Sequence, residues 1–297
     1  MAGETIAVFT KNRSNPAYAA ARLGADRVAA RSGARTLHFV PVQPDNIDEQ
    51  TALVGQAIAA RPDAMIFVPV HATAMDASVA KVNAAGIPMV NYLNRLGRGR
   101  FVSFVGSDDY RLARDVAAYL FRHIGGKGDV LLMEGAPGAV TSRERVRGFL
   151  DAVKEWPGIR IAATRIGDFL EERARVVMRE FLSTGIRIDG VLSANDVMSL
   201  GALSVLDAAG MKLPVIGVNA LPEAITAIKA GRLLATVDFD AMKIAGIATE
   251  AAIRHLRGQP VPPEIILPVQ IVDRSNCDGW DRALEEREGI AWEDVVR

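Results

Sequence analysis

Side chains that can bind a small polar ligand gather in a few stretches of this 297-residue chain, such as 11–18, 92–100 and 143–147. Asparagine and arginine recur there, together with aromatic residues. The guanidinium fork of arginine suits hydroxyl and carboxylate ligands, and an amide both donates and accepts hydrogen bonds. A ring such as that of Tyr18 either packs in the core or offers its face to a ligand. The chemistry that these residue types favour is binding.

Each of these motifs also has a purely structural interpretation. Asn15 precedes Pro16, a pair that by itself is best explained as a helix N-cap followed by proline at the first helical position. Asn195 before Asp196 is explained equally well by a cap or by an amide facing a cleft. Arg143 stands at the start of a predicted helix, where a cation opposes the helix dipole. This unfavourable placement favours a binding role for Arg143, although a solvated surface explains it too.

Catalytic signatures are missing from the sequence. Residues 126–128 read Gly-Lys-Gly, without the spacing or the Ser or Thr of a phosphate-binding loop, and no Gly-x-Ser-x-Gly elbow occurs. The four histidines never recur at metal-ligand spacing, and Cys277 is the single cysteine. His71 lies in a loop but has no nucleophile beside it, which favours an ordinary polar contact. We therefore expect no enzyme, no metal and no cofactor.

Charge and hydropathy exclude further classes. The chain carries 35 Lys plus Arg against 35 Asp plus Glu, so its formal net charge is zero. A neutral surface gains little from a polyanion, which argues against nucleic acid or an acidic membrane as a partner. No stretch approaches the roughly 20 apolar residues of a membrane helix, so direct membrane insertion is not expected.

Apolar runs of strand length alternate with amphipathic helical stretches along the chain, and this alternation predicts βαβ units with parallel sheets. In a first series we expect strands over 5–10, 37–40, 64–68, 88–92 and 101–105, and helices over 16–31, 48–60, 73–85 and 109–123. In a second series we expect strands over 130–133, 160–166, 190–193 and 215–218, and helices over 142–155, 171–183, 196–209 and 222–230. A strand over 234–237, a helix over 241–257 and a strand over 265–272 then return to complete the two sheets.

The expected elements say where a ligand would bind. In open parallel sheets a ligand lies beyond the carboxyl ends of the strands, where loops lead into helix N-termini. These loops are 11–18, 69–73, 92–100, 134–145, 167–172, 194–198 and 219–223.

In order and spacing, the motifs resemble those of the type I periplasmic binding proteins of sugar transporters, and most closely the ribose-binding proteins. The matching runs are Thr5–Val8 with Asn15-Pro16, Gly86–Pro88, Gly106–Asp108, Arg143–Arg145 with Gly148-Phe149, Asn195-Asp196 with Leu200–Ala202, and Val215–Val218. The resemblance covers about residues 5 to 272.

The resemblance implies an α/β fold of two similar doubly wound parallel-sheet lobes, joined by a hinge that the chain crosses several times. We expect an N-terminal lobe of residues 1–106 plus 240–268, and a C-terminal lobe of residues 107–239 plus 269–297. Residues 274–297 go beyond the ribose-binder pattern. In this tail, Trp280 and Trp292 are expected to pack against a lobe or to contact a partner.

The function implied by the resemblance is binding of a monosaccharide or polyol between the lobes of a monomeric protein, and delivery to the permease of an ABC transporter. The implied location is the periplasm, with an export signal removed from this sequence. Chemotaxis receptors are occasional second partners in the family. A sugar-responsive bacterial repressor shares the two-lobe core, but the first strand starts at Thr5 without a DNA-binding head before it, and this favours transport.

The resemblance also implies which residues bind the ligand. Carried over position by position, they are Lys11, Asn15, Tyr18, His71, Asn94, Arg95, Arg143, Phe169, Asn195, Asn219, Asp238 and Phe239.

Several of these positions depart from the ribose-binder pattern. Asn94 and Asn219 stand where those proteins usually carry Asp, Lys11 replaces a small polar residue, and Ala17 replaces an aromatic one. Phe239 stands where a Gln is expected, and it either restores the lost stacking surface or packs in the hinge. Two missing carboxylates and an added lysine leave a sugar acid open as an alternative ligand.

Overall fold

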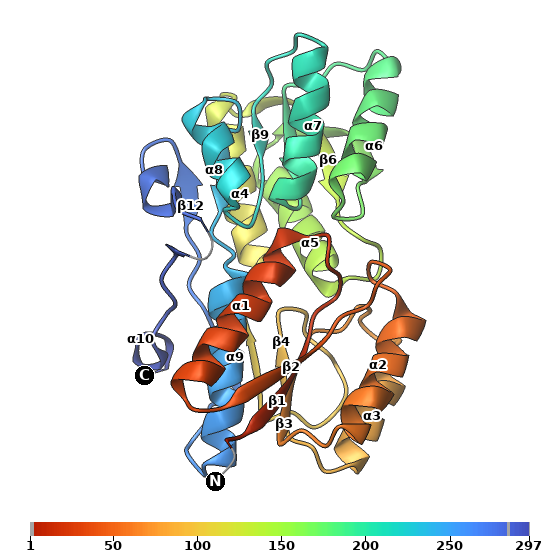
Figure 1. Cartoon of the computed structure of the whole chain (residues 1–297). Coiled ribbons are helices and arrows are strands. Elements are labelled where there is room, and N and C mark those ends of the chain that lie inside the picture. Colours follow the sequence, from red (N-terminus) through yellow and green to blue (C-terminus); the bar gives the residue numbers. More distant parts are fainter. Residues whose placement is uncertain (1–2, 284–285, 297) are drawn as a thin grey trace. The chain divides into compact units, whose positions relative to one another are not determined.

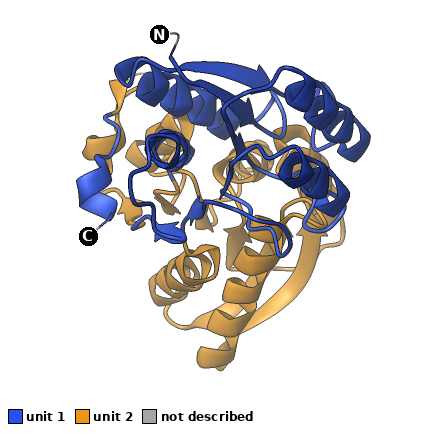
Figure 2. Ribbon diagram, turned by 90° about the horizontal axis from the view of Figure 1, so that it is seen from below, with its two compact units in different colours: residues 1–107, 240–268, 288–297 blue, residues 108–239, 269–287 orange. Residues whose placement is uncertain are grey.

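The computed structural model describes residues 3–283 and 286–296 (Figure 1). The chain divides into two compact units, unit 1 with residues 1–107, 240–268 and 288–297, and unit 2 with residues 108–239 and 269–287 (Figure 2). It passes from one unit to the other after residues 107, 239, 268 and 287. Two boundaries differ from the expected ones, because Ser107 and the segment 288–297 belong with unit 1.

Unit 1 is built on a parallel sheet. Its strands are β1 (Thr5–Phe9), β2 (Arg35–Phe39), β3 (Ala64–Phe67), β4 (Met89–Tyr92), β5 (Ser103–Gly106) and β11 (Glu264–Ile266). Within the described residues their order is β11-β5-β4-β3-β1-β2, and every pairing is parallel. The four strands β1, β3, β4 and β5 are buried throughout, as expected for a sheet covered on both faces.

Helices cover both faces of this sheet. The helices of unit 1 are α1 (Pro16–Arg31), α2 (Ile47–Ala59), α3 (Asp76–Ala84), α9 (Ala241–Leu256) and the short α10 (Trp292–Val295), which lies beside α9. Helix α1 packs along α9, which lies on β3, β4 and β5, while α2 and α3 pack together on the opposite face (Figure 1). Trp292 is buried, with the Arg254 guanidinium carbon of α9 4.5 Å from its ring centroid. This contact fastens α10 to unit 1.

Unit 2 repeats the architecture. Its strands are β6 (Lys127–Glu134), β7 (Gly158–Ile166), β8 (Gly190–Ser193), β9 (Val215–Ile216), β10 (Ala235–Val237) and β12 (Ile271–Asp273). Their order in the described part of the chain is β12-β10-β9-β8-β6-β7, with β12 antiparallel to β10 and the other pairs parallel. The helices are α4 (Asp109–His123), α5 (Val140–Glu155), α6 (Glu171–Ser183), α7 (Asp196–Ala208), α8 (Pro222–Lys229) and the 3₁₀ helix η1 (Cys277–Trp280).

The expected α/β class with two parallel-sheet lobes is confirmed, and so is the return of the late elements to both sheets. One predicted strand is wrong. Residues 265–272 form two short strands, β11 in unit 1 and β12 in unit 2, instead of one continuous strand. Pro268, which has no N–H to donate to a ladder, separates them at a point where the chain changes unit.

The helix predicted over 73–85 begins only at Asp76, after a turn. The helices α1, α4 and α6 have the predicted bounds. None of the helices in residues 3–283 and 286–296 has the length and apolar character needed to cross a membrane.

Candidate functional site

The predicted ligand-binding residues of unit 1 lie at one edge of its sheet. Lys11, Asn15 and Tyr18 follow β1, His71 follows β3, and Asn94 and Arg95 follow β4. These strands are parallel neighbours in the order β4-β3-β1, so their carboxyl ends meet at the same edge. The topology therefore brings the three loops together. We call the predicted ligand-binding residues in these loops the half-site of unit 1.

The loop after β1 is ordered by amide side chains. Asn15 caps α1 because its Oδ1 accepts the N–H of Ala17 at 3.0 Å, and this confirms the structural interpretation of the Asn-Pro pair. The N–H of Asn15 in turn donates to Oδ1 of Asn12 at 2.9 Å. Tyr18 is half-buried one turn into the helix. A ligand contact by Asn15 or Tyr18 stays a prediction.

Lys11 is almost fully buried, with a side chain only 2% exposed. Its Nζ lies 3.0 Å from Oδ1 of Asp45, in the loop between β2 and α2. The added positive charge of Lys11 is therefore compensated within unit 1.

His71 holds its own loop. Its Nδ1 accepts the N–H groups of Thr73 and Ala74, both at 3.2 Å, so that a neutral ring carries its proton on Nε2. These bonds order the turn that delays the start of α3.

Asn94 is 1% exposed, and its Nδ2 makes a long hydrogen bond of 3.4 Å to the carbonyl of Pro69. Its Oδ1 has no hydrogen-bond partner among the described residues. A buried acceptor without a donor costs about 1–3 kcal/mol. A ligand contact by Asn94 stays a prediction.

Arg95, next to Asn94, is half-exposed, and its side chain contacts two residues of unit 1. Its guanidinium forms an ion pair with Glu264 of β11 and lies 3.8 Å from the ring centroid of Phe104 on β5. Burial lowers the pKa of Arg95 from its usual value. Its charge is therefore balanced by Glu264.

The predicted residues of unit 2 lie at the corresponding edge of the second sheet. Arg143 follows β6, Phe169 follows β7, Asn195 follows β8, Asn219 follows β9, and Asp238 and Phe239 follow β10. The order β10-β9-β8-β6-β7 makes all five strands consecutive, and neighbouring strands pair in parallel. Unit 2 thus carries a second half-site, one loop for each strand.

The arginine that helix α5 buries is Arg145. The side chain of Arg143 is 66% exposed and pairs with Glu144 at 3.1 Å. Arg145 is 3% exposed; its Nε lies 2.7 Å from Oδ1 of Asp109, and its Nη1 donates to the carbonyl of Ala194 at 2.7 Å. The prediction from sequence missed Arg145, although its position four residues before the buried Phe149 places it on the inward face.

Phe239 lies beneath this arginine, since its ring centroid is 4.6 Å from the guanidinium carbon of Arg145, and it is 5% exposed. This contact supports packing as the role of Phe239, in preference to an exposed stacking surface. Phe169 is half-buried and closely approaches Gly135, where a Cβ atom would lie 2.0 Å from the Phe169 ring. Gly135 therefore makes room for the ring.

Asn195 caps α7 by accepting the N–H of Met198 at 2.9 Å, so its structural interpretation is confirmed. The next residue, Asp196, is fully buried and fixes the neighbouring loops. It accepts the hydroxyl of Thr236 at 2.6 Å and the N–H of Leu221 at 2.9 Å, and burial raises its pKa to about 6. A Cβ at Gly217 would lie 2.2 Å from this carboxylate, which explains the glycine in the Val215–Val218 run.

Asn219 is half-buried in the loop that Asp196 fixes. Asp238 is half-buried at the end of β10, and its N–H donates to the carbonyl of Gln270 at 2.8 Å. Both positions stay predictions as ligand contacts.

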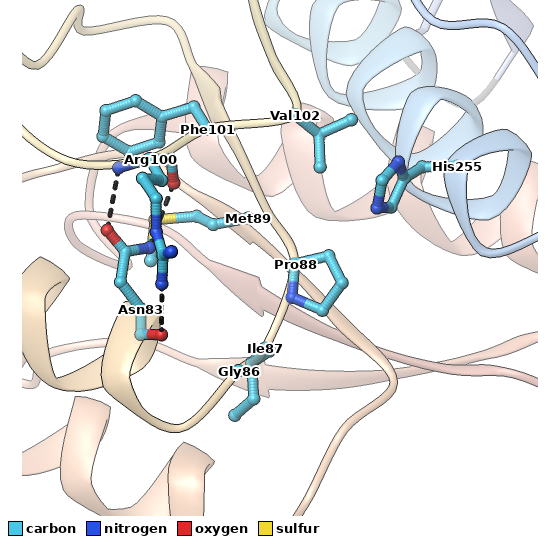
Figure 3. A pocket seen from close by; sticks show the side chains of 9 residues that line it. All are labelled: Asn83, Gly86, Ile87, Pro88, Met89, Arg100, Phe101, Val102 and His255. Carbon is cyan, nitrogen blue, oxygen red and sulfur yellow. Dashed lines mark hydrogen bonds between the residues drawn. The ribbon is translucent and has the colours of Figure 1, made fainter.

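A cavity of about 270 Å³ lies elsewhere in unit 1 (Figure 3). It is lined by Asn83, Gly86, Ile87, Pro88, Met89, Arg100, Phe101, Val102 and His255. Most of these residues directly precede β4 and β5, so the cavity lies at the amino ends of the strands, away from the loops described above. It contains none of the predicted ligand-binding residues. Across the described residues, no cluster of three or more His, Cys, Asp or Glu could hold a metal ion.

The two units are α/β domains, each with a mainly parallel sheet, and comparison with known proteins identifies the family of this fold. The sequence model of the periplasmic binding protein domain matches residues 6–260, so the chain belongs to this family. The resemblance noted from the motifs is thereby confirmed.

Individual relatives cover most of the chain. The ribose import binding protein of Bacillus subtilis (strain 168) is 29% identical over 267 residues, which are 90% of this chain and 86% of the relative. An ABC transporter periplasmic solute-binding protein from Actinobacillus succinogenes 130z, solved with bound D-allose, has a TM-score of 0.88 and 29% identity, covering 93% of this chain and 99% of the other. An ABC transporter solute-binding protein from Bacillus halodurans C-125, solved with bound myo-inositol, has a TM-score of 0.88 and 25% identity, covering 95% and 98%.

Proposed function

We propose that this protein binds an uncharged monosaccharide or polyol and delivers it to the permease of an ABC transporter in the periplasm. The observation that carries the proposal is the pair of half-sites, in which amides and rings stand at the carboxyl edge of each sheet. Amides satisfy hydroxyl groups, and aromatic rings pack on the apolar C–H faces of a sugar. Relatives solved with D-allose and with myo-inositol support the same ligand class.

The charge balance of the cations in the predicted site supports an uncharged ligand. Lys11 pairs with Asp45, Arg95 with Glu264, and Arg143 with Glu144, each partner lying in the same unit as its cation. A ligand carboxylate would have to compete with these acids. Asn94 Oδ1 is an acceptor, which attracts a hydroxyl proton and repels a carboxylate. The sugar acid left open by the sequence is therefore not favoured.

The proposed mechanism is conformational and involves no catalysis. A ligand that contacts both half-sites binds the closed arrangement of the units better than the open one, and this difference in affinity shifts the population. The permease then distinguishes the loaded protein from the empty one. Because the chain changes unit after residues 107, 239, 268 and 287, several connecting segments are available to act as a hinge.

The proposal is tested by thermal unfolding with D-ribose, D-allose, myo-inositol, xylitol and, as anions, D-gluconate and D-galacturonate. A ligand present at 100 times its dissociation constant stabilises the fold by about 2.7 kcal/mol. We expect a neutral sugar or polyol to raise the melting temperature and the acids to leave it unchanged. A shift produced by the acids alone, or by none of the compounds, would overturn the proposal.

Asn94 provides the matched test of the site. Replacing Asn94 with Ala removes the buried acceptor that we assign to a ligand hydroxyl. We expect a loss of about tenfold in affinity, measured by calorimetric titration, which corresponds to about 1.4 kcal/mol. Asn83→Ala changes the same residue type in the same unit, but at the cavity on the opposite edge of the sheet. That variant is expected to bind like the wild type. Equal effects of the two substitutions would contradict this placement of the site.

A further inference from the structure

The C-terminal segment, of which the structure describes residues 274–283, 286 and 287, belongs to unit 2 and lies next to one of the loops in the proposed ligand site. The segment lies beyond residue 260, where the match to the family model ends. Its 3₁₀ helix η1 packs against α8, and Lys229 of α8 pairs with Asp278 at 3.0 Å and with Asp281 at 2.5 Å. Helix α8 begins at Pro222, directly after the loop that carries Asn219.

Arg287 connects the segment to this loop. Its side chain is buried, with the residue 8% exposed. Nη1 donates to the carbonyl of Ala220 at 2.7 Å, Nη2 to the carbonyl of Trp280 at 2.8 Å, and Nε to the carbonyl of Arg282 at 3.3 Å. The rigid guanidinium fork thus joins the carbonyls of Trp280 and Arg282 in the C-terminal segment to the backbone beside Asn219.

The loop needs such support because its backbone is strained. Asn219 has φ of 128° and Ala220 has φ of 49°, in the left-handed region that residues with a side chain seldom adopt. Neighbouring contacts must therefore hold this conformation. The N–H of Ala220 donates to Oγ1 of Thr236 at 3.3 Å, and the N–H of Leu221 donates to Asp196 at 2.9 Å. These bonds hold the N–H side of the loop, and Arg287 holds the carbonyl side.

We propose that Arg287 is a positioning residue for ligand binding, through which the C-terminal segment holds the Asn219 loop in its binding conformation. This assignment rests on the proposed function, in which Asn219 contacts the sugar or polyol. Arg287 acts through the backbone of Ala220 and does not contact the ligand itself. The segment thereby supports the site at the end of β9, a strand of only two residues.

The test compares Arg287→Met and Arg287→Lys with Lys229→Ala. Met keeps much of the apolar bulk but removes every donor, whereas Lys can still donate to the carbonyl of Ala220. Lys229→Ala releases the same segment at its ion pairs with Asp278 and Asp281 and leaves the Ala220 contact intact. This variant therefore controls for general loosening of the segment.

Two measurements follow each variant: hydrogen exchange at the amides of residues 219–221 without ligand, and titration with D-allose. We expect Arg287→Met to speed exchange at these amides at least tenfold and to weaken D-allose binding about tenfold. Arg287→Lys should recover part of both losses, and Lys229→Ala should stay within twofold of the wild type.

Unchanged exchange in Arg287→Met would overturn the proposal, and so would faster exchange with unchanged affinity, or an equal effect of Lys229→Ala. If Arg287→Met does not fold, the same two measurements are made on Arg287→Lys, and the same outcomes would overturn the proposal. If wild-type protein does not bind D-allose, the titration uses the neutral compound that raises the melting temperature most. If no neutral compound binds, the proposed function fails by itself, and the exchange rates still decide whether Arg287 holds the loop.

Discussion

The two half-sites share a topology but differ in what holds their loops. In unit 1 the supports are buried, uncharged amides. Gln50 donates to the carbonyl of Val68 at 3.0 Å and accepts the N–H of Val70 at 2.9 Å, which fixes the loop after β3. Asn91 donates to the carbonyls of Phe67 at 3.0 Å and Asn94 at 2.9 Å, and it accepts the N–H of Leu96 at 2.9 Å.

In unit 2 the corresponding supports are buried ionisable groups. Arg145, paired with Asp109, donates to the carbonyl of Ala194, next to Asn195. Asp196 and Arg287 make hydrogen bonds to the backbone of the loop that carries Asn219. Burial raises the pKa of both Asp109 and Asp196 to about 6. Of the predicted site residues in unit 1, Lys11 is a buried ion, but its partner Asp45 remains 21% exposed.

The difference matters because an amide has no charge to desolvate, whereas a buried ion is costly unless its partners stay in place. Removal of one support in unit 1 should therefore cost a few hydrogen bonds, whatever the pH. Removal of Arg145 in unit 2 should leave the buried charge of Asp109 uncompensated, and changes at Asp109 or Asp196 should have consequences that vary with pH.

The largest effect is expected for Arg145→Met. The substitution leaves the carboxylate of Asp109 buried without its cation and removes the donor to Ala194, at a cost of about 3–5 kcal/mol in the free energy of unfolding. Urea unfolding measures this cost. The double variant Asp109→Leu with Arg145→Met should regain much of it, because no charge then remains buried.

Arg143→Met is the control on the same helix. Its side chain is 66% exposed, and an exposed ion pair contributes at most about 1 kcal/mol. If Arg143→Met and Arg145→Met destabilised the protein equally, the contrast between the two arginines would be wrong.

A smaller loss is expected for the matching change in unit 1. Asn91→Ala breaks three hydrogen bonds that order the turn of Asn94, and we expect a cost of about 1–3 kcal/mol that is the same at pH 7 and pH 5. Urea unfolding at the two pH values measures it.

Asn91→Asp should convert the support in unit 1 to the type found in unit 2. The new carboxylate can accept the N–H of Leu96 but has nothing to donate to the carbonyls of Phe67 and Asn94. Burial should raise its pKa, so this variant should be more stable at pH 5 than at pH 7 relative to Asn91→Ala. Equal pH dependence of the two variants would show that ionisation at this position is unimportant.

The helices and strands could largely be predicted from the sequence, whereas the buried side chains that hold the loops could not. The bounds of α1 and α4 follow from side-chain N-caps and helical periodicity, and those of α6 follow from periodicity alone. The βαβ alternation places every predicted loop at a carboxyl edge. Arg145 was missed because an arginine at a helix start looks like a surface residue until the inward face is traced back from Phe149. Arg287 carries no local signal, because its partner Ala220 lies 67 residues away in the chain. Residues 265–272 were predicted as one strand because the sequence does not show that β11 joins the sheet of unit 1 and β12 the sheet of unit 2.

The smallest effect, and the sharpest test of the contrast, is the pH dependence of Asp196→Asn. The pKa of Asp196 is about 6 in the folded protein, against an ordinary value of 3.8. The carboxylate of Asp196 therefore binds a proton more tightly in the folded protein than in the unfolded chain. The free energy of unfolding should then rise as the pH falls from 7 to 5, by on the order of 1 kcal/mol for each such group. Glu4, whose pKa is lowered to about 2, acts in the opposite direction, but its contribution is lost mainly below its ordinary value of 4.5.

Asp196→Asn keeps an oxygen for the N–H of Leu221 but removes the titration, so its stability gain between pH 7 and pH 5 should be smaller than that of the wild type. Asp109 is retained and should keep its own part of the gain. Asp207→Asn makes the same change on the same helix at a side chain that is 46% exposed. Urea unfolding of the three proteins at both pH values should therefore separate Asp196→Asn from the other two. A wild-type gain that survives intact in Asp196→Asn would mean that this carboxylate is not the titrating support of the Asn219 loop.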